Sequence, residues 1–289
     1  MPKNVVIPSL TNLEKIKKDI LRDGKEKLHV LSDFDRTLTY AFVKGEKMPS
    51  LISILRSSGD YLGDDYAAKA QALYEKYHPI EINLDTPLKE RKKSMEEWWR
   101  THFKLLIESG LNKKHLVTVV KSPMIKFREG ALKFFDTLYR NEIPLVIMSA
   151  SGLGGDAIAA VLKKAGKLYS NIHIVSNSFS WNKGGRAVAV KEPIIHTLNK
   201  DETILKDFSF YEKIENRKNV LLLGDNLEDM GMIEGFNYKH LIKVGFLNEN
   251  IEENLEHYKK FFDVLILNDS SMKYANLLLK EITKELSRD

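Results

Sequence analysis

The chain has 289 residues, of which 43% are hydrophobic and 29% charged, and it contains no cysteine. This composition excludes disordered, collagen-like and low-complexity chains, and the lack of cysteine excludes disulfides, a thiol nucleophile and cysteine-ligated metal sites. The net charge of +5 comes from 45 basic and 40 acidic residues. Because both signs are dispersed along the chain, the charge is typical of a mixed solvated surface with a mild preference for anionic ligands.

Nothing in the sequence indicates a membrane-bound or secreted protein. A membrane helix needs about 20 apolar residues, and no run of this sequence approaches that length. The first residues also lack the apolar stretch of about 7–15 residues that a secretory signal requires. We therefore expect a cytoplasmic protein with no membrane partner, and a monomer rather than an oligomer.

Short apolar runs of strand length alternate with helical patterns, which is typical of a parallel sheet with helices on both faces. The expected strands are Leu28–Ser32, Leu145–Ser149, Ile172–Ser176, Val220–Gly224, Leu241–Val244 and Val264–Leu267. The expected helices among them are Gly130–Asn141, Asp156–Ala165, Pro193–Lys200 and Asn226–Glu234. The runs Leu145–Met148 and Val220–Leu223 lack polar alternation, so we expect both to be central strands buried on both faces.

Residues 47–122 break this alternation with helical patterns in succession, at Asp64–Tyr77, Pro87–Gly110 and Asn112–Lys121. The second pattern begins with proline and ends with glycine, as helices often do. We therefore predict an α/β fold with two domains. A Rossmann-like parallel-sheet core comprises residues 1–46 and 123–289, and a helical cap domain, residues 47–122, is inserted over the carboxyl edge of its sheet.

Acidic pairs follow two of the expected strands. Asp33 and Asp35 come directly after Leu28–Ser32, and side chains two residues apart at a strand end point the same way. Asp225 and Asp229 follow Val220–Gly224 one helical turn apart, and therefore share a face. The alternatives are an ordinary turn for the first pair and helix capping for the second.

The two acidic pairs are expected to meet, because the carboxyl ends of parallel strands lie at the same edge of a sheet. Carboxylate and carbonyl oxygens suit Mg²⁺ better than softer metals. At the same edge, Ser149 and Ala150 open a glycine-rich turn, SASGLGGD, that precedes a helix. A hydroxyl, backbone N–H groups and a helix N-terminus favour anion binding there, although such loops are often only turns.

These elements, in this order, resemble the haloacid dehalogenase superfamily of phosphoryl-transfer enzymes, and within it the cytosolic pyrimidine 5′-nucleotidase (type III cytosolic 5′-nucleotidase) family. The segments that carry the resemblance are LSDFDRTL (Leu31–Leu38), YEKYHPIE (Tyr74–Glu81), MEEWW (Met95–Trp99), REGALKFF (Arg128–Phe135), IVSN (Ile174–Asn177), IIHTLNK (Ile194–Lys200) and LLGDNLED (Leu222–Asp229). The resemblance implies a haloacid dehalogenase-like core and Mg²⁺-dependent hydrolysis of nucleoside 5′-monophosphates.

The resemblance also implies a role for each acidic residue. Asp33 would attack phosphorus to form an aspartyl-phosphate, and Asp35 would act as general acid and then general base. Asp33, the backbone carbonyl of Asp35, and Asp225 would hold Mg²⁺, with Asp229 in the outer coordination shell.

Phosphate binding is assigned by the same resemblance. Ser149 and the N–H of Ala150 would bind phosphate oxygens. Lys200 is the expected phosphate-binding lysine, since it ends the segment IIHTLNK and lies 25 residues before Asp225. Lys191 is the second candidate and Lys183 a third.

Base recognition would come from the cap. By family position, Glu81 would accept hydrogen bonds from the base, Trp99 would stack on it, and His102 would make a small polar contact. An indole is the best cation–π partner among side chains, so Trp99 suits the charged base 7-methylguanine as well as neutral pyrimidines. The alternative is that Trp98 and Trp99 both pack in the core of the cap.

The chain departs from the family pattern in three places. The glycine-rich turn after Ser149 is about two residues longer, Arg36 replaces an uncharged side chain, and Tyr40–Phe42 does not reproduce the expected aromatic wall of the base pocket. The leading hypothesis is a Mg²⁺-dependent nucleotidase for pyrimidine or 7-methylguanosine monophosphates. A related phosphatase for another small phosphomonoester is the first alternative, and a basic nucleic-acid-binding protein is the second and disfavoured one.

Overall fold

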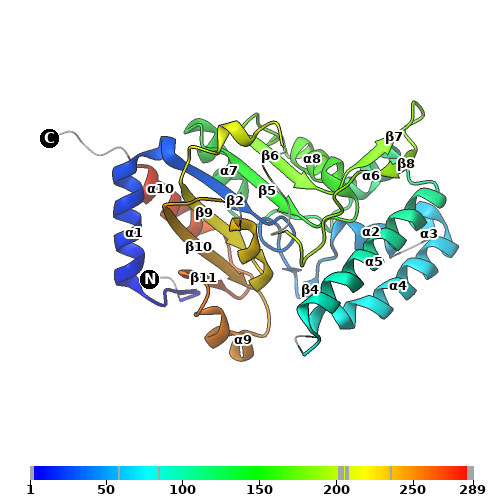
Figure 1. The fold of residues 1–289 in the computed structure, drawn as a ribbon, viewed down its shortest axis with the longest axis horizontal. Coiled ribbons are helices and arrows are strands. Elements are labelled where there is room, and N and C mark those ends of the chain that lie inside the picture. Colours follow the sequence, from blue (N-terminus) through cyan, green and yellow to red (C-terminus); the bar gives the residue numbers. More distant parts are fainter. Residues whose placement is uncertain are drawn as a thin grey trace.

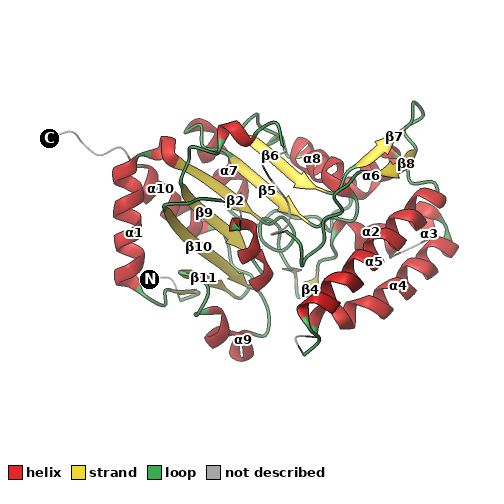
Figure 2. Cartoon of the chain, viewed as in Figure 1, coloured by secondary structure: helices red, strands yellow, loops and turns green. Residues whose placement is uncertain are grey.

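The computed structural model describes residues 3–57, 59–83, 85–200, 205, 208–234 and 236–284. Figure 1 shows an α/β core with a twisted sheet, and a group of helices at one end of the molecule, beyond the sheet. Figure 2 shows that this second region is built almost entirely of helices. The predicted fold class, a parallel-sheet core with a helical insertion, is confirmed.

The core contains a seven-stranded sheet in the order β1-β11-β10-β9-β2-β5-β6. The strands are β1 (Val5–Val6), β2 (Leu28–Ser32), β5 (Leu145–Ser149), β6 (Ile172–Ser176), β9 (Asn219–Gly224), β10 (His240–Leu247) and β11 (Val264–Leu267). All neighbours are parallel except β1, which is antiparallel to β11. The six predicted strands are therefore present, and β1, only two residues long, was missed.

Side chains of the central strands alternate between two buried faces, as predicted. On one face, Val30, Ile147 and Leu221 pack under long helices. These helices are α1 (Leu10–Asp23), α7 (Ala131–Arg140), α8 (Gly154–Lys164) and α10 (Lys273–Thr283). On the other face, the cover is thinner and consists of α9 (Ile251–Tyr258), two 3₁₀ turns, η3 (Tyr211–Lys213) and η4 (Leu227–Ile233), and loops.

The helical insertion lies between β2 and β5 in the chain. Its helices are α2 (Leu51–Arg56), α3 (Gly59–Leu62), α4 (Asp64–Ile82), α5 (Leu88–Glu108) and α6 (Lys113–Lys121). The hairpin β3 (Phe42–Val43) and β4 (Glu46–Lys47) leads into it, and the hairpin β7 (Phe179–Trp181) and β8 (Ala187–Val190) reaches back from the core to contact α5. Both hairpins were missed, since their strands are too short to show a pattern.

Two predicted helices take other forms. Residues 226–234 form the 3₁₀ helix η4, and residues 193–200, predicted as a helix, form an irregular loop. Side-chain amides replace helical hydrogen bonds in this loop: Asn177 binds both backbone groups of Ile195, and Asn199 accepts from the N–H of His196. None of the helices in the described part of the chain has the length and apolarity needed to cross a membrane.

Candidate active site

Three adjacent strands bring acidic and hydroxyl side chains to one edge of the sheet. β2 lies between β9 and β5, so Asp33 after β2, Asp225 after β9 and Ser149 at the end of β5 lie at neighbouring strand ends. The N–H of Asp33 donates to the carbonyl of Leu223 at 3.0 Å, which extends the pairing of β2 with β9 into the site. Carboxylate oxygens of Asp33, Asp225 and Asp229 all lie within 4.8 Å of one another. Three of the four residues of the predicted acidic pairs, Asp33, Asp225 and Asp229, therefore converge, and Asp35 is not part of this group.

Lys200 joins this acidic cluster from the 193–200 loop. Its Nζ lies 2.7 Å from Oδ1 of Asp33 and 2.7 Å from Oδ1 of Asp229, and the residue is 6% exposed. The other two candidate lysines, Lys183 and Lys191, are exposed on the surface. Geometry thus favours Lys200 among the three.

Burial dominates the electrostatics of the cluster. It raises the pKa of Asp33 to about 7, even though the Lys200 charge opposes the shift. Burial also raises the pKa of Asp225 well above its ordinary value, and the nearby charges of Asp33 and Asp229 add to the effect. One ammonium group does not balance three clustered carboxylates, so the donor set fits a divalent cation bound by oxygen ligands.

The oxygens of Asp229 differ from those of the other two carboxylates. Oδ2 accepts from the N–H groups of Asp225 and Asn226 at 3.1 Å each, while Oδ1 faces Lys200. Asp229 is therefore both a member of the acidic cluster and a hydrogen-bond acceptor that holds the turn after β9. Thr37 donates to Oδ1 of Asp225 over 3.5 Å, and Tyr258 donates to its carbonyl at 3.2 Å.

Asp35 lies at the edge of the cluster and is half-buried. Burial raises its pKa to about 6, which suits a group that gives and takes a proton near neutral pH. Arg36 adopts a φ of 61°, its guanidinium lies 3.9 Å from the Glu249 carboxylate, and its charge opposes the rise in the pKa of Asp35.

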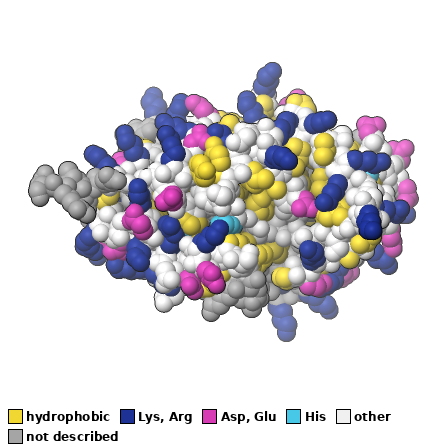
Figure 3. All heavy atoms as spheres, turned by 90° about the horizontal axis from the view of Figure 1, so that it is seen from above, with side chains coloured by type: hydrophobic (Ala, Val, Ile, Leu, Met, Phe, Trp, Pro, Cys, Tyr) yellow, Lys and Arg dark blue, Asp and Glu magenta, His cyan; other side chains and the backbone are white. Residues whose placement is uncertain are grey.

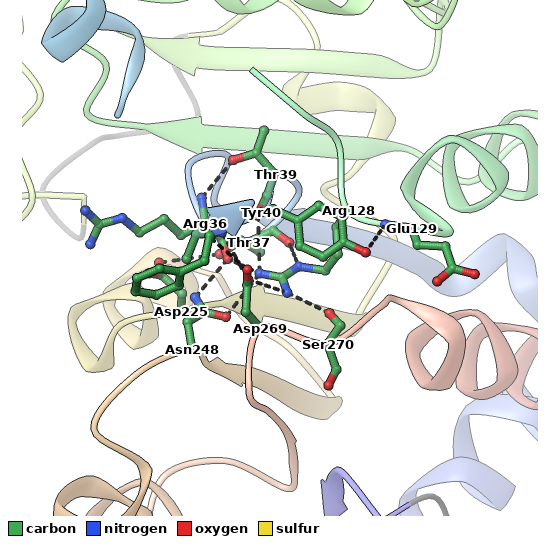
Figure 4. Close-up of polar contacts among 12 residues, drawn as sticks. Arg36, Thr37, Thr39, Tyr40, Arg128, Glu129, Asp225, Asn248, Asp269 and Ser270 are labelled. Carbon is green, nitrogen blue, oxygen red and sulfur yellow. Dashed lines mark hydrogen bonds and ion pairs between the residues drawn. The ribbon is translucent and has the colours of Figure 1, made fainter. Parts of the chain in front are cut away.

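A buried arginine, Arg128, supports the loop that carries these carboxylates (Figure 4). It donates to the carbonyl of Thr37 at 3.0 Å, to that of Ser270 at 2.6 Å, and to that of Arg36. It also donates to the carbonyl of Thr39 at 3.3 Å and to Oδ1 of Asn248 at 3.1 Å, and it forms an ion pair with Asp269 at 2.9 Å. Sequence reasoning quoted Arg128 only as part of a matching segment, since no local pattern reveals a partner so distant in the chain.

Asp269 continues this support into the residues beyond the loop. Its carboxylate accepts from the N–H groups of Ala41 at 3.0 Å and Phe42 at 2.8 Å. The Tyr40 ring lies 5.3 Å from the guanidinium of Arg128, and its hydroxyl accepts from the N–H of Glu129 (Figure 4). Tyr40 and Ala41 thus contact the Arg128–Asp269 pair and its neighbours, which support the loop after β2.

The loop after β5 lies directly beneath the helical insertion. Ser149 is 2% exposed and ends β5, and Ala150 follows it half-buried. A Cβ atom on Gly152 would come within 2.9 Å of side-chain atoms of both Ile52 and Trp99. Ser151, which sequence reasoning did not select, has a buried hydroxyl with no partner among the described residues. The loop therefore presents serine hydroxyls, and the helical insertion packs tightly against it.

The two adjacent tryptophans have different environments. Trp98 is 8% exposed and packs with Tyr77 and Leu198, whereas Trp99 is half-buried and contacts the loop after β5. The buried Nε1 of Trp99 has no hydrogen-bond partner among the described residues. Trp99 thus lies at the edge of the sheet that carries the acidic cluster, whereas Trp98 packs in the core of the insertion.

Glu81 lies in the last turn of α4, and both of its carboxylate oxygens are engaged. Oε1 accepts from the hydroxyl of Thr197 at 2.8 Å, and Oε2 lies 3.0 Å from Nδ1 of His78. His102 is 3% exposed, its Nε2 lies 3.3 Å from the hydroxyl of Tyr66, and burial lowers its pKa to about 3. His102 is therefore neutral and enclosed within the insertion, next to Trp99, at 6.3 Å between ring centroids.

Comparison with known proteins identifies the family. The family model of pyrimidine 5′-nucleotidase (UMPH-1) matches residues 36–283. The chain belongs to this family. It is accordingly a 5′-nucleotidase, a hydrolase of phosphoric monoesters. Asp33 and Asp35 lie before the first matched residue, so the family match itself does not include them.

Relatives of this 5′-nucleotidase cover most of its length. The 7-methylguanosine phosphate-specific 5′-nucleotidase B of Xenopus laevis is 36% identical over 265 residues, covering 91% of this chain and 90% of the relative. The 7-methylguanosine phosphate-specific 5′-nucleotidase of Homo sapiens is 33% identical over 283 residues, covering 98% and 93%.

Solved structures agree on the fold of the nucleotidase. Cytosolic 5′-nucleotidase IIIB bound to cytidine superimposes with a TM-score of 0.89 at 27% identity, covering 99% of this chain and 95% of that one. A substrate-bound phosphoserine phosphatase, at 18% identity and a TM-score of 0.52 over 86% of this chain and 96% of that one, shares the fold. The resemblance to haloacid dehalogenase-type enzymes and to the cytosolic nucleotidases is thereby confirmed.

Proposed function

We propose that this enzyme hydrolyses the 5′-monophosphates of 7-methylguanosine and of pyrimidine nucleosides, with Mg²⁺ and through an aspartyl-phosphate on Asp33. The observation that carries the proposal is the position of Lys200, which pairs with Asp33 inside a cluster of three carboxylates at a parallel sheet edge. Relatives named for 7-methylguanosine phosphate and a structural neighbour bound to cytidine support these two substrate classes.

The reaction has two displacements. A carboxylate oxygen of Asp33 attacks phosphorus, the bond from phosphorus to the nucleoside O5′ breaks, and Asp35 gives its proton to that oxygen. Asp35, now ionised, takes a proton from water as the water attacks phosphorus, and the bond from phosphorus to Asp33 breaks. Phosphate leaves, Asp35 is again protonated, and Asp33 is again a carboxylate.

The remaining residues of the site bind and orient the phosphate. Lys200 faces the carboxylate that attacks, where it would balance the charge of the incoming phosphate. Ser149 and the N–H of Ala150 would donate to phosphate oxygens. Asp33, Asp225 and the backbone carbonyl of Asp35 would hold Mg²⁺, with Asp229 in its outer coordination shell; when bound, the ion supplies positive charge between carboxylates and phosphate.

Base recognition is proposed for the helical insertion, with residues 47–122 acting as a cap on a core of residues 1–46 and 123–289. Trp99 would stack on the base, and the carboxylate of Glu81 would accept from its amino or imino groups. The contact of Trp99 with Gly152, in the loop proposed to bind phosphate, supports this placement. His102, which is enclosed next to Trp99, is the third residue proposed for base recognition, through a small polar contact.

The wider setting is also proposed. On the face drawn in Figure 3, Lys and Arg are interspersed with Asp and Glu, which supports a nucleotide rather than long nucleic acid as the partner. A cytoplasmic location is supported by the cytosolic neighbour and the lack of cysteine. We further propose that the enzyme acts as a monomer without a membrane partner.

The test is phosphate release with and without Mg²⁺ from 7-methyl-GMP, CMP, UMP, AMP, phosphoserine and glucose phosphate, with Asp33→Asn as the blank. The proposal expects metal-dependent release from 7-methyl-GMP and from CMP or UMP that the variant lacks. Release only from phosphoserine or glucose phosphate would keep the catalytic assignment and refute the base recognition. No release from any compound would refute the proposed function.

A further inference from the structure

The 193–200 loop contacts both the acidic cluster and the helical insertion. Its last residue, Lys200, pairs with Asp33, and three residues earlier Thr197 donates to the Glu81 carboxylate in the insertion. Between them, Leu198 is 5% exposed and packs against Trp98. One short segment of the core therefore supplies both a charge at the nucleophile and a hydrogen bond to the residue proposed to read the base.

The loop is fixed at its other end to the segment that would bind phosphate. The side chain of Asn177 donates to the carbonyls of Ile195 at 2.8 Å and Ser151 at 3.2 Å, and its oxygen accepts from the N–H of Ile195 at 2.8 Å. Asn177 is 1% exposed. Because these hydrogen bonds are buried, they hold the backbone near Thr197 in place and so fix the position of its hydroxyl.

Glu81 is also fixed along its backbone. Its carbonyl accepts two bonds from the guanidinium of Arg91, which in turn pairs with Glu228 at 3.3 Å. The backbone of Glu81 is thus set by a buried arginine, while the direction of its carboxylate is set by Thr197 on one oxygen and His78 on the other. Each oxygen retains a lone pair, which a base amino group could use.

We propose that Thr197 is a positioning residue for base recognition, because its hydroxyl holds the Glu81 carboxylate in the orientation that accepts hydrogen bonds from the base. This inference rests on the proposed role of Glu81. Base preference is then set partly by the core loop that carries Lys200, rather than by the insertion alone. Thr197 touches no reacting atom, so its effect belongs to substrate binding and not to the chemical step.

The test compares Thr197→Val with Thr197→Ser, which removes and keeps the hydroxyl respectively. Thr197→Val should raise KM for 7-methyl-GMP and CMP about tenfold and change kcat less than about twofold. Hydrolysis of p-nitrophenyl phosphate, which has no base to recognise, should change little, and Thr197→Ser should restore KM. Thr118→Val is the matched control, since Thr118 is exposed and its hydroxyl donates to the carbonyl of Lys114 one turn earlier in its own helix.

A double-mutant cycle with Glu81→Gln separates positioning from a general effect on the loop. Thr197→Val should add almost nothing to the base-dependent KM in the Glu81→Gln background. An equal fall in kcat for all three substrates would overturn the inference, because it would mean that the loop and Lys200 had moved. If Thr197→Val does not fold, Thr197→Ala is used in the same cycle. Absence of nucleotide hydrolysis by the unaltered enzyme would instead refute the proposed function, and this inference with it.

Discussion

At the scale of single residues, one buried lysine faces two buried carboxylates. Lys200 lies 2.7 Å from each of Asp33 and Asp229. Lys200→Met should lower kcat for nucleotide hydrolysis at least about 100-fold and destabilise the protein by about 3 kcal/mol, because two carboxylates then lose their buried partner. Steady-state kinetics and urea unfolding measure both effects. Lys191→Met, at an exposed position, is the control, and equal losses in the two variants would contradict the assignment.

Arg128 is the residue on which the loop after β2 depends. It is 1% exposed and bonded to four carbonyls, to the side chain of Asn248 and to Asp269. Arg128→Lys keeps the charge but cannot make the planar set of bonds, so we expect a loss of about 3 kcal/mol in the free energy of unfolding, together with a fall in kcat. Urea unfolding at neutral pH checks the first. Arg140→Lys, on the exposed side of α7, should change neither quantity.

His29 makes the stability of the folded protein depend on pH, separately from any effect on catalysis. Burial lowers its pKa to about 4, and its Nδ1–H donates to the carbonyl of Arg217 at 2.7 Å. The folded state therefore holds His29 neutral while the unfolded chain binds a proton below about pH 6.5, so this contribution to stability is present above that pH and falls as pH drops toward 4.

The measurement is the free energy of unfolding of the wild type and of His29→Asn at pH 7 and pH 5. The difference between the two proteins should shrink at pH 5, by at most about 3 kcal/mol for a complete titration, because only the wild type loses the contribution of His29. The other titrating groups are the same in the two proteins, so their contributions cancel in the difference between the two unfolding free energies. Parallel pH curves would contradict the prediction.

At the scale of elements, long strands were predictable and irregular connections were not. The apolar runs of β5 and β9 fix both their position and their burial on two faces, and the order of parallel strands places the acidic pairs together. The 193–200 loop escaped prediction because its backbone is satisfied by Asn177 from a distant segment, which no local pattern encodes. Short hairpins such as β7–β8 escaped because strands of three or four residues are too short to show a pattern.

The contact between the insertion and the loop after β5 is tight enough to test. A Cβ on Gly152 would meet side-chain atoms of Ile52 and Trp99 at 2.9 Å. Gly152→Ala should therefore push the insertion away from the loop and lower kcat/KM about tenfold, since misplaced binding groups slow the reaction. Gly184→Ala, where the nearest atom is 3.4 Å away, is the matched control. Unchanged kinetics in Gly152→Ala would show that the insertion need not close so tightly.

At the scale of the whole molecule, the site is assembled from segments far apart in the sequence. The acidic residues and Lys200 belong to recognisable segments, so sequence reasoning named them. Arg128 with Asp269, and Glu81 with Thr197, form partnerships across more than a hundred residues that only the folded chain reveals. The sequence therefore nominated the candidate site residues, whereas the hydrogen bonds and ion pairs that hold them in place became visible only in the folded chain.

The covalent intermediate is the central claim, and it can be observed directly. The enzyme with Mg²⁺ is mixed with 7-methyl-GMP carrying a radiolabelled phosphate, quenched in acid within the first turnover, and digested for peptide mapping. The account predicts label on the peptide that contains Asp33, released by hydroxylamine as expected for an acyl phosphate, and no label in Asp33→Asn. Phosphate release by the unaltered enzyme without label on that peptide at any quench time would contradict it.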